Sequence, residues 1–187
     1  MYQSAIKLPK FNPDIRLFGN ISEHMLGEFF RQQGEVKTSG PIVIELSTSG
    51  GAADVGRRMA DELRLWQEQG RELFFLGKTY VYSAGVTVMS AFPPTHRFLT
   101  RDCELLVHER KLDKNIHLAG ALRGCRAAVL DVLAEIESGQ RLERHGFEQL
   151  VKGTPLSIDD VMNKVMDKDW YLSGEEAVAA GLVQAVV

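Results

Sequence analysis

Apolar side chains recur at steps of three and four residues in some stretches of the chain and form short unbroken runs in others. The stepped stretches predict helices after Ser22, around 55–66 and over 118–144. The unbroken runs, many of them β-branched or aromatic, predict strands at 15–18, 42–46, 72–76, 97–99, 105–107 and 182–187. Strands that alternate with helices predict an α/β fold, in which strand ends and turns are the places to look for chemistry.

Turn and capping residues mark where further elements begin and end. Residues 83–91 predict a short buried helix that stops before a Pro-Pro pair. The S-x-x-D and S-x-x-E capping boxes that start at Ser157 and Ser173 predict one short helix each. Gly77 is expected to form a turn directly after the strand at 72–76.

The helix expected over 118–144 carries an apolar stripe along its whole length. Its members follow one another at steps of three and four: Leu122, Cys125, Val129, Val132 and Ile136. This spacing is typical of a helix-packing seam. An unusually long helix with such a seam favours an oligomer.

The composition is that of a globular protein, with 44% hydrophobic and 25% charged residues. The 187 residues contain no linker-like stretch, so we expect a single domain over 1–187 whose first dozen residues form an arm. The net charge of -3 argues against a nucleic-acid binder that relies on bulk positive charge. No run reaches the roughly 18 apolar residues of a membrane span, so no membrane partner is expected. The two cysteines lack disulfide or zinc spacing, which favours a reduced, cytoplasmic chain.

Two turns combine into a candidate site. Gly50 and Gly51 lie between a buried strand and a helix, where backbone N–H groups can hold a phosphate or a developing oxyanion. Ser83 lies at the next strand-to-helix junction, with only small residues after it. A serine there is either a helix cap or a nucleophile that sees the positive end of the helix dipole.

A serine nucleophile needs a base, and the base needs a group that orients it. Of the five histidines, His108 follows a strand, where α/β sites are built, whereas His96 and His117 are expected at the surface. Asp169 precedes an aromatic pair and is the candidate for orienting the histidine. Taken alone, His108 can equally be a partly buried strand-end residue and Asp169 a solvated one.

The chain resembles the Clp protease proteolytic subunit family, the ClpP-like serine peptidases. The matching motifs occur in family order: S-T-S-G-G at 47–51, Y-S-A-G at 82–85, V-H-E-R at 107–110 and D-W-Y-L-S-G-E-E-A-V-A-A-G-L-V at 169–183. The last motif is the most specific. The step of 25 residues from Ser83 to His108 is also typical of the family.

The resemblance implies a role for each candidate. Ser83 would be the nucleophile, His108 the general base and Asp169 the group that orients it, with the N–H groups of Gly51 and Ala84 as the oxyanion hole. The implied fold is the ClpP/crotonase-like spiral of β-β-α units with a long handle helix. The implied protein is a cytoplasmic serine endopeptidase that needs no cofactor, forms a homo-oligomeric ring and cuts peptides or unfolded proteins.

Several positions depart from the family pattern. Ser49 replaces a proline, Glu109 and Arg110 replace Gln-Pro, and Trp170 replaces an arginine that helps to join two rings. The step from His108 to Asp169 is 61 residues, about a dozen more than the family pattern leads us to expect. The extra length falls around 135–151, in the handle helix. Stacking of two rings and the ATPase unfoldase partner of the family therefore stay open.

Three other functions remain possible. A crotonase-type enzyme resembles this family in fold and in its oxyanion hole, but it needs an acyl-CoA site. A non-catalytic ring subunit would retain the assembly without the chemistry. A Ser–Lys dyad would require a lysine such as Lys111 or Lys114, and nothing in the sequence selects either of them.

Overall fold

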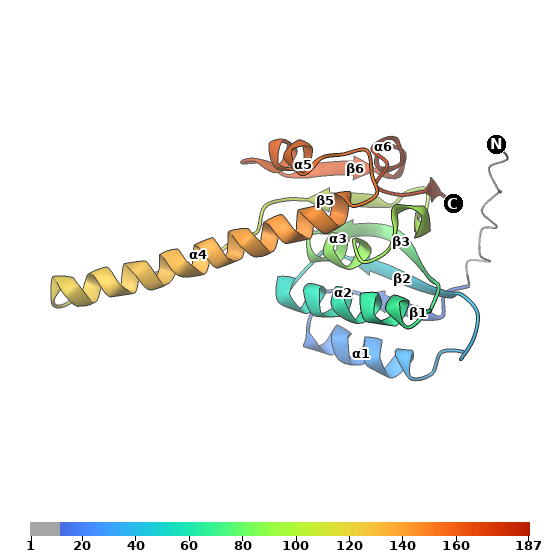
Figure 1. Ribbon diagram of the computed structural model, residues 1–187, viewed down its shortest axis with the longest axis horizontal. Coiled ribbons are helices and arrows are strands. Elements are labelled where there is room, and N and C mark those ends of the chain that lie inside the picture. The colour runs from blue at the N-terminus through green and yellow to red at the C-terminus, as the bar shows by residue number, and fades with distance from the viewer. Residues whose placement is uncertain (1–11) are drawn as a thin grey trace.

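The computed structural model describes residues 12–187, and the strands within this range form one sheet (Figure 1). In chain order they are β1 (Ile15–Phe18), β2 (Ile42–Thr48), β3 (Leu73–Tyr82), β4 (Arg97–Leu99), β5 (Glu104–Val107), β6 (Trp170–Ser173) and β7 (Ala185–Val186). The pairing order is β1-β2-β3-β4-β7, all parallel. β5 adds in parallel to β3, and β6 adds antiparallel to β5.

The helices pack against this sheet and form the rest of the core. They are α1 (Glu23–Gln33), α2 (Ala53–Glu68), α3 (Ala84–Met89), α4 (Leu122–Val151), α5 (Ile158–Val165) and α6 (Gly174–Ala179), with one 3₁₀ turn at Pro94–His96. Strands and helices alternate through the first half of the chain, which confirms the α/β prediction. The predicted arm lies outside the described residues except for Asn12.

β3 is longer than the sequence pattern predicts, and the turn expected at Gly77 was wrong. The strand continues through Gly77 to Tyr82, because a glycine here leaves room for its neighbours. A Cβ at this position would stand 2.6 Å from the Leu99 side chain and 2.9 Å from that of Val81. The extended β3 pairs with β4 through its first half and with β5 through its second half, and thereby links two parts of the sheet.

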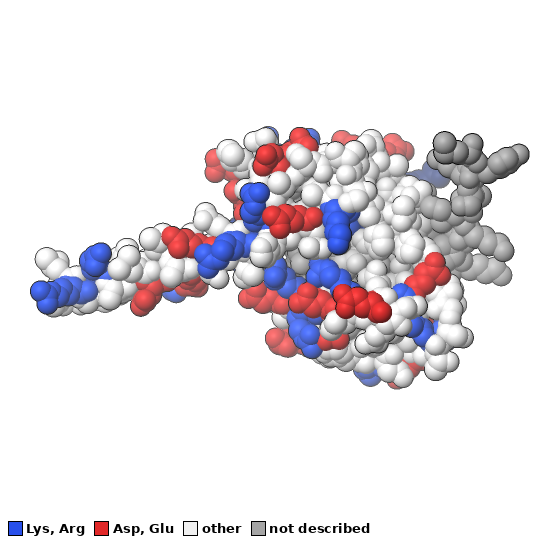
Figure 2. Space-filling model, viewed as in Figure 1, with Lys and Arg blue, Asp and Glu red and all other residues white. Residues whose placement is uncertain are grey.

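The long helix is displaced from its predicted range. α4 begins at Leu122 rather than 118 and runs on to Val151, so His117 lies in the loop before it. Its first half projects far from the body of the molecule (Figure 1), and the predicted stripe is largely exposed there, as Val129 and Ile136 show. Figure 2 shows that charged side chains of both signs are interspersed along this projecting part.

The short elements near the C-terminus follow their local signals. Ser157 and Asp160 form a reciprocal capping box on α5, and Ser173 and Glu176 form another on α6. The terminal strand is shorter than predicted and consists of the two residues of β7.

A buried cation connects the sheet to the helices. Arg97 on β4 is 1% exposed, and its guanidinium donates to four carbonyl oxygens, those of Phe92, Leu150, Leu182 and Ser90. Burial lowers the pKa of Arg97 to about 10, so the side chain is still charged at neutral pH. The second half of α4 is fixed to the core in this way, whereas the first half is not.

Candidate active site

Ser83 occupies a strained turn between β3 and α3. Its backbone has φ of 56° and ψ of −117°, in a region that non-glycine residues rarely enter. Such strain costs roughly 1–3 kcal/mol and tends to occur at functional turns. The Ser83 hydroxyl makes no capping hydrogen bond to α3, so the structure rejects the helix-cap interpretation.

The two glycines that precede α2 allow this turn to be approached closely. Gly50 and Gly51 have φ of 106° and 141°, and a Cβ on Gly50 would stand 2.8 Å from the Cβ of Ser83. A Cβ on Gly51 would stand 2.3 Å from the carbonyl oxygen of Ile21. Only glycine fits both positions, and at Gly50 the turn before α2 packs directly against Ser83.

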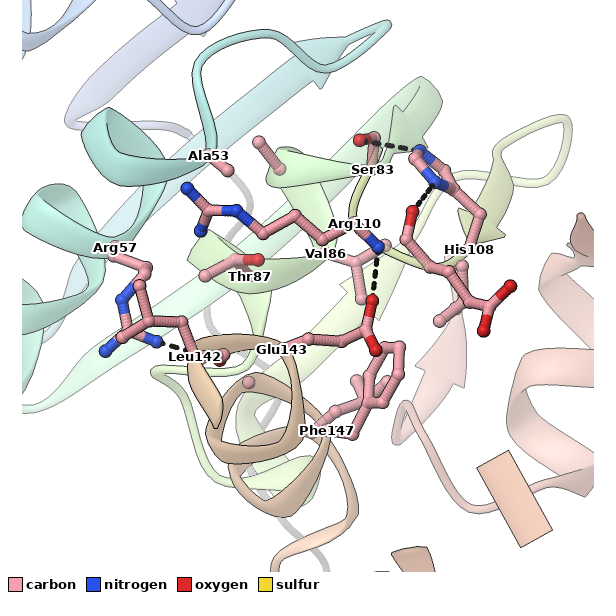
Figure 3. Close-up of a pocket in the computed structure, with 15 residues that line it drawn as sticks. Ala53, Arg57, Ser83, Val86, Thr87, His108, Arg110, Leu142, Glu143 and Phe147 are labelled. Atoms are coloured by element: carbon pink, nitrogen blue, oxygen red, sulfur yellow. Dashed lines mark hydrogen bonds between the residues drawn. The ribbon is translucent and has the colours of Figure 1, made fainter. Parts of the chain in front are cut away.

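The pairing of β3 with β5 brings His108 to Ser83. Tyr82 is in register with Leu106, and the N–H of Ser83 donates to the carbonyl oxygen of Leu106 at 2.8 Å. His108 follows β5 directly, and its Nε2 lies 2.8 Å from the Oγ of Ser83 (Figure 3). This is the arrangement in which an imidazole can remove the hydroxyl proton.

The other ring nitrogen of His108 has a backbone partner. Nδ1 lies 2.5 Å from the carbonyl oxygen of Glu109, which fixes the proton on Nδ1 and leaves Nε2 as the acceptor toward Ser83. The Glu109 carboxylate points the other way and accepts the N–H of Asp167. Glu109 therefore ties the segment after His108 to the loop that leads to Asp169.

Asp169 lies beside His108 in the sheet, but its carboxylate is paired elsewhere. In the antiparallel β5–β6 pair, Val107 faces Trp170, and the next pair in that register would be His108 with Asp169. Instead, Oδ1 of Asp169 lies 3.5 Å from Nζ of Lys111, and both side chains are well exposed. The structure thus brings Ser83 and His108 into contact and leaves Asp169 as a near neighbour.

Ser83 and His108 open onto a cavity between α2, α3 and α4 (Figure 3). Its walls are mainly apolar, and they come from Ala53, Ala84, Val86, Val107, Leu142, Phe147 and Leu150. Besides Ser83 and His108, five polar side chains also line it: Arg57, Thr87, Glu109, Arg110 and Glu143. The sequence analysis missed Arg57 and Glu143, because no local motif marks them and only the packing of α4 against α2 and α3 brings them to the serine.

Arg110 bridges the elements around the cavity. Its backbone N–H donates to the Glu143 carboxylate on α4, and its guanidinium pairs with Asp54 of α2 at 2.9 Å. These contacts hold the segment after His108 in place on two sides.

Neither the buried thiol of Cys103 nor a metal-binding cluster forms a competing site among the described residues. Burial raises the pKa of the Cys103 thiol to about 12, so it stays protonated and unreactive at neutral pH. Residues 12–187 contain no group of three or more His, Cys, Asp or Glu side chains arranged to hold a metal ion. Within the same range no helix is both long and apolar enough to cross a membrane.

Comparison with known proteins places these features in a family context. The family model described as Clp protease matches residues 14–187. A Rhizobium johnstonii protein named ATP-dependent Clp protease proteolytic subunit 3 is 28% identical over 148 residues, covering 78% of this chain and 68% of that protein. A Treponema pallidum protein named ATP-dependent Clp protease proteolytic subunit 2 is 24% identical over 176 residues, covering 92% of this chain and 81% of that protein.

A solved structure gives the fold. A ClpP1 mutant from Listeria monocytogenes superimposes with a TM-score of 0.74, at 19% identity, over 92% of this chain and 90% of that one. The predicted ClpP fold is therefore confirmed.

Proposed function

The chain belongs to the Clp protease family, and from this membership we propose that it is a serine endopeptidase that works through an acyl-enzyme. The observation that carries the proposal is the 2.8 Å contact between Nε2 of His108 and Oγ of Ser83, at a strained turn that opens onto a cavity.

In the proposed reaction, Oγ of Ser83 attacks the substrate carbonyl carbon while His108 takes the hydroxyl proton at Nε2. The C–N bond then breaks, and the imidazolium gives its proton to the departing amine. Water, activated by the same histidine, hydrolyses the acyl-enzyme and restores Ser83. This chemistry requires no cofactor.

The N–H groups of Gly51 and Ala84 are proposed to hold the developing oxyanion. Within residues 12–187 no hydrogen-bond acceptor occupies either group, and the N–H of Ala84 belongs to the first residue of α3. Loss of one such donor typically costs about 10² to 10³ in rate.

Asp169 is proposed to orient His108 once its carboxylate leaves Lys111. The β5–β6 register supports this assignment, since it makes the two residues cross-strand neighbours. In the described conformation the Glu109 carbonyl oxygen holds Nδ1 instead. The proposed reacting state therefore differs from the described one by a local rearrangement of Asp169 and of the backbone at Glu109.

Two alternatives lose support from the contacts of Ser83. A Ser–Lys dyad would need a lysine at the serine, but Lys111 pairs with Asp169 and Lys114 pairs with Glu135. A non-catalytic ring subunit would have no use for the strained backbone at Ser83 or for the contact of its hydroxyl with His108. A crotonase-type enzyme remains distinguishable by a titration with acyl-CoA, for which we expect no binding.

A ring of identical subunits is the proposed assembly, in the cytoplasm, with peptide or unfolded-protein substrates. The names of both relatives include the term ATP-dependent, which makes an ATPase unfoldase a candidate partner here too. The exposed apolar stripe of α4 supports contact between copies.

Labelling with a small fluorophosphonate followed by peptide mapping tests the proposal. We expect an adduct on Ser83 that is lost in Ser83→Ala and strongly reduced in His108→Ala. His117→Ala is the matched control, since His117 is exposed in the loop before α4 and should leave labelling unchanged. An adduct that forms equally well in His108→Ala, or no adduct in the wild type, would contradict the proposal.

A further inference from the structure

The lining of the cavity beside Ser83 contains a positively charged side chain, Arg57, that has no role in the proposed reaction. Arg57 on α2 lines this cavity, and within residues 12–187 its guanidinium forms no ion pair. The acidic residues one turn away on the same helix are engaged: Asp54 pairs with Arg110, and Asp61 pairs with Arg64. An arginine keeps its charge at any physiological pH, so Arg57 presents a positive charge that these carboxylates do not cancel by direct contact.

The orientation of Arg57 is fixed by one hydrogen bond. Nη1 donates to the carbonyl oxygen of Leu142 on α4 at 3.1 Å. A guanidinium has five N–H donors, so most of them remain for a ligand. The side chain is only half-buried, which allows a ligand to reach it without a large desolvation cost to the arginine.

Two residues of the cavity lining beside Arg57 are small, which leaves space for a substrate side chain. Ala53 precedes Arg57 by one helical turn, and Gly146 of α4 also lines the cavity. A Cβ on Gly146 would meet no atom within 4 Å. Figure 3 shows Arg57 and the Ser83–His108 pair at opposite sides of the view, with Thr87 and the side chain of Arg110 between them.

The two acidic residues of the cavity lining are turned toward other partners. The carboxylate of Glu143 accepts the backbone N–H of Arg110, and the carboxylate of Glu109 accepts that of Asp167. Neither is engaged with Arg57. The cavity therefore combines apolar walls along its length with an unpaired guanidinium across from the nucleophile.

We propose that Arg57 makes this site selective for an acidic residue, glutamate before aspartate, on the amino side of the cut bond. The methylenes of glutamate would lie along Val86 and Leu142, and its carboxylate would meet the guanidinium. Glutamate is favoured because its side chain is longer and the arginine stands across the cavity from Ser83. This inference rests on the proposed peptidase function and adds a substrate class to it.

Peptides that differ only in the residue before the cut test the proposal. Internally quenched peptides with Glu, Gln, Leu or Lys at that position are compared by kcat/KM. Glu and Gln have nearly the same shape, so their ratio isolates the charge. We expect Glu to exceed Gln by about tenfold, the effect of a hydrogen-bonded charge pair at a half-buried arginine rather than of a fully exposed one.

Variants of Arg57 and of its neighbour Arg58 show whether Arg57 causes the preference for Glu over Gln. Arg57→Met removes the charge but keeps most of the stem, and we expect the Glu/Gln ratio to fall to about one, whereas Arg57→Lys retains part of it. Arg58→Met is the matched control, because Arg58 is exposed and pairs with Glu62 on the outer face of α2. A ratio that is unchanged in Arg57→Met, or a wild type that cuts the Gln peptide as fast as the Glu peptide, overturns the inference.

Fluorophosphonate labelling distinguishes a peptidase that lacks the proposed selectivity from a chain that is not a peptidase. A chain that takes the adduct on Ser83 but shows equal Glu and Gln rates is a peptidase without the proposed selectivity. For a chain that neither takes the adduct nor cuts any peptide, fluorescein-labelled peptides that end in Glu or Gln supply the second measurement. Tighter binding of the Glu peptide that is lost in Arg57→Met supports the inference, and equal affinity overturns it.

Discussion

The two sides of His108 are built in different ways. On the side of Ser83, buried strands in register and a glycine without room for a Cβ fix the contact at 2.8 Å. On the side of Asp169, the carboxylate is 37% exposed and is paired with a lysine that is itself 73% exposed. Exposed ion pairs contribute only about 0–1 kcal/mol, so this side is easily rearranged. The nucleophile and base are therefore held by the core, whereas the orienting group is held only by a weak surface contact.

Among the changes that test this difference, substitution of Asp169 has the largest expected effect on kcat/KM. If Asp169 orients His108 in the reacting state, Asp169→Asn should lower kcat/KM by about 10³ to 10⁴, because the wrong tautomer of the histidine is then favoured. Peptide hydrolysis measures the loss, and Asp167→Asn, on the same loop, is the control. A decrease of less than tenfold would mean that the Glu109 carbonyl oxygen suffices to orient the base.

Glycine-to-alanine changes test the Ser83 side of His108, which the core holds in place. Gly50→Ala should destabilise the protein by about 1–3 kcal/mol, since the new Cβ would stand 2.8 Å from that of Ser83 and φ is 106°. Gly124→Ala, in the exposed first half of α4, meets no atom within 4 Å and should stabilise by about 1 kcal/mol. Chemical denaturation gives both values, and two changes of the same sign would contradict the contrast.

Removal of Lys111, which pairs with the Asp169 carboxylate, tests the Asp169 side of His108. Lys111→Met should raise kcat/KM by a few-fold, because the Asp169 carboxylate is then free to turn to His108. Lys114→Met removes a pair with Glu135 far from the serine and should leave the rate unchanged. Added salt should raise the wild-type rate for the same reason and have less effect on Lys111→Met. Equal rates in all three proteins would show that Lys111 does not restrain Asp169.

The smallest expected effect is a loss of stability in acid at α5, the helix that precedes Asp169. Hydrogen bonds from the Ser157 hydroxyl and backbone hold the pKa of Asp160 below its ordinary value. The stability that this carboxylate contributes is present above the ordinary pKa of about 3.9 and is lost as the pH falls through the lowered value. The protection of α5 amides against hydrogen exchange, relative to the intrinsic rate at each pH, should therefore fall below about pH 4 in the wild type and already be lowered at neutral pH in Asp160→Asn. Protection that does not change between neutral pH and about pH 3 would argue against the capping role.

Local signals predicted the parts of the fold that depend on neighbouring residues. The capping boxes at Ser157 and Ser173 form as the S-x-x-D and S-x-x-E patterns indicate, because their partners are only three residues away. The turn predicted at Gly77 was wrong, since a glycine is needed there to leave room for the side chain of Leu99, which lies on another strand. The start of α4 was also misplaced, because the loop before it carries apolar residues that continue the helical spacing.

The predictions for the candidate site show the same difference between local features and contacts of distant segments. The sequence by itself determined that Gly50 and Gly51 form a turn before a helix, and that Ser83 sits at a strand-to-helix junction. Tertiary structure alone decided that His108 meets Ser83, that Asp169 turns to Lys111 and that Arg57 faces the cavity from another helix. The physical reason is that turn and helix preferences act over a few residues, whereas these contacts depend on strand register and helix packing between distant segments.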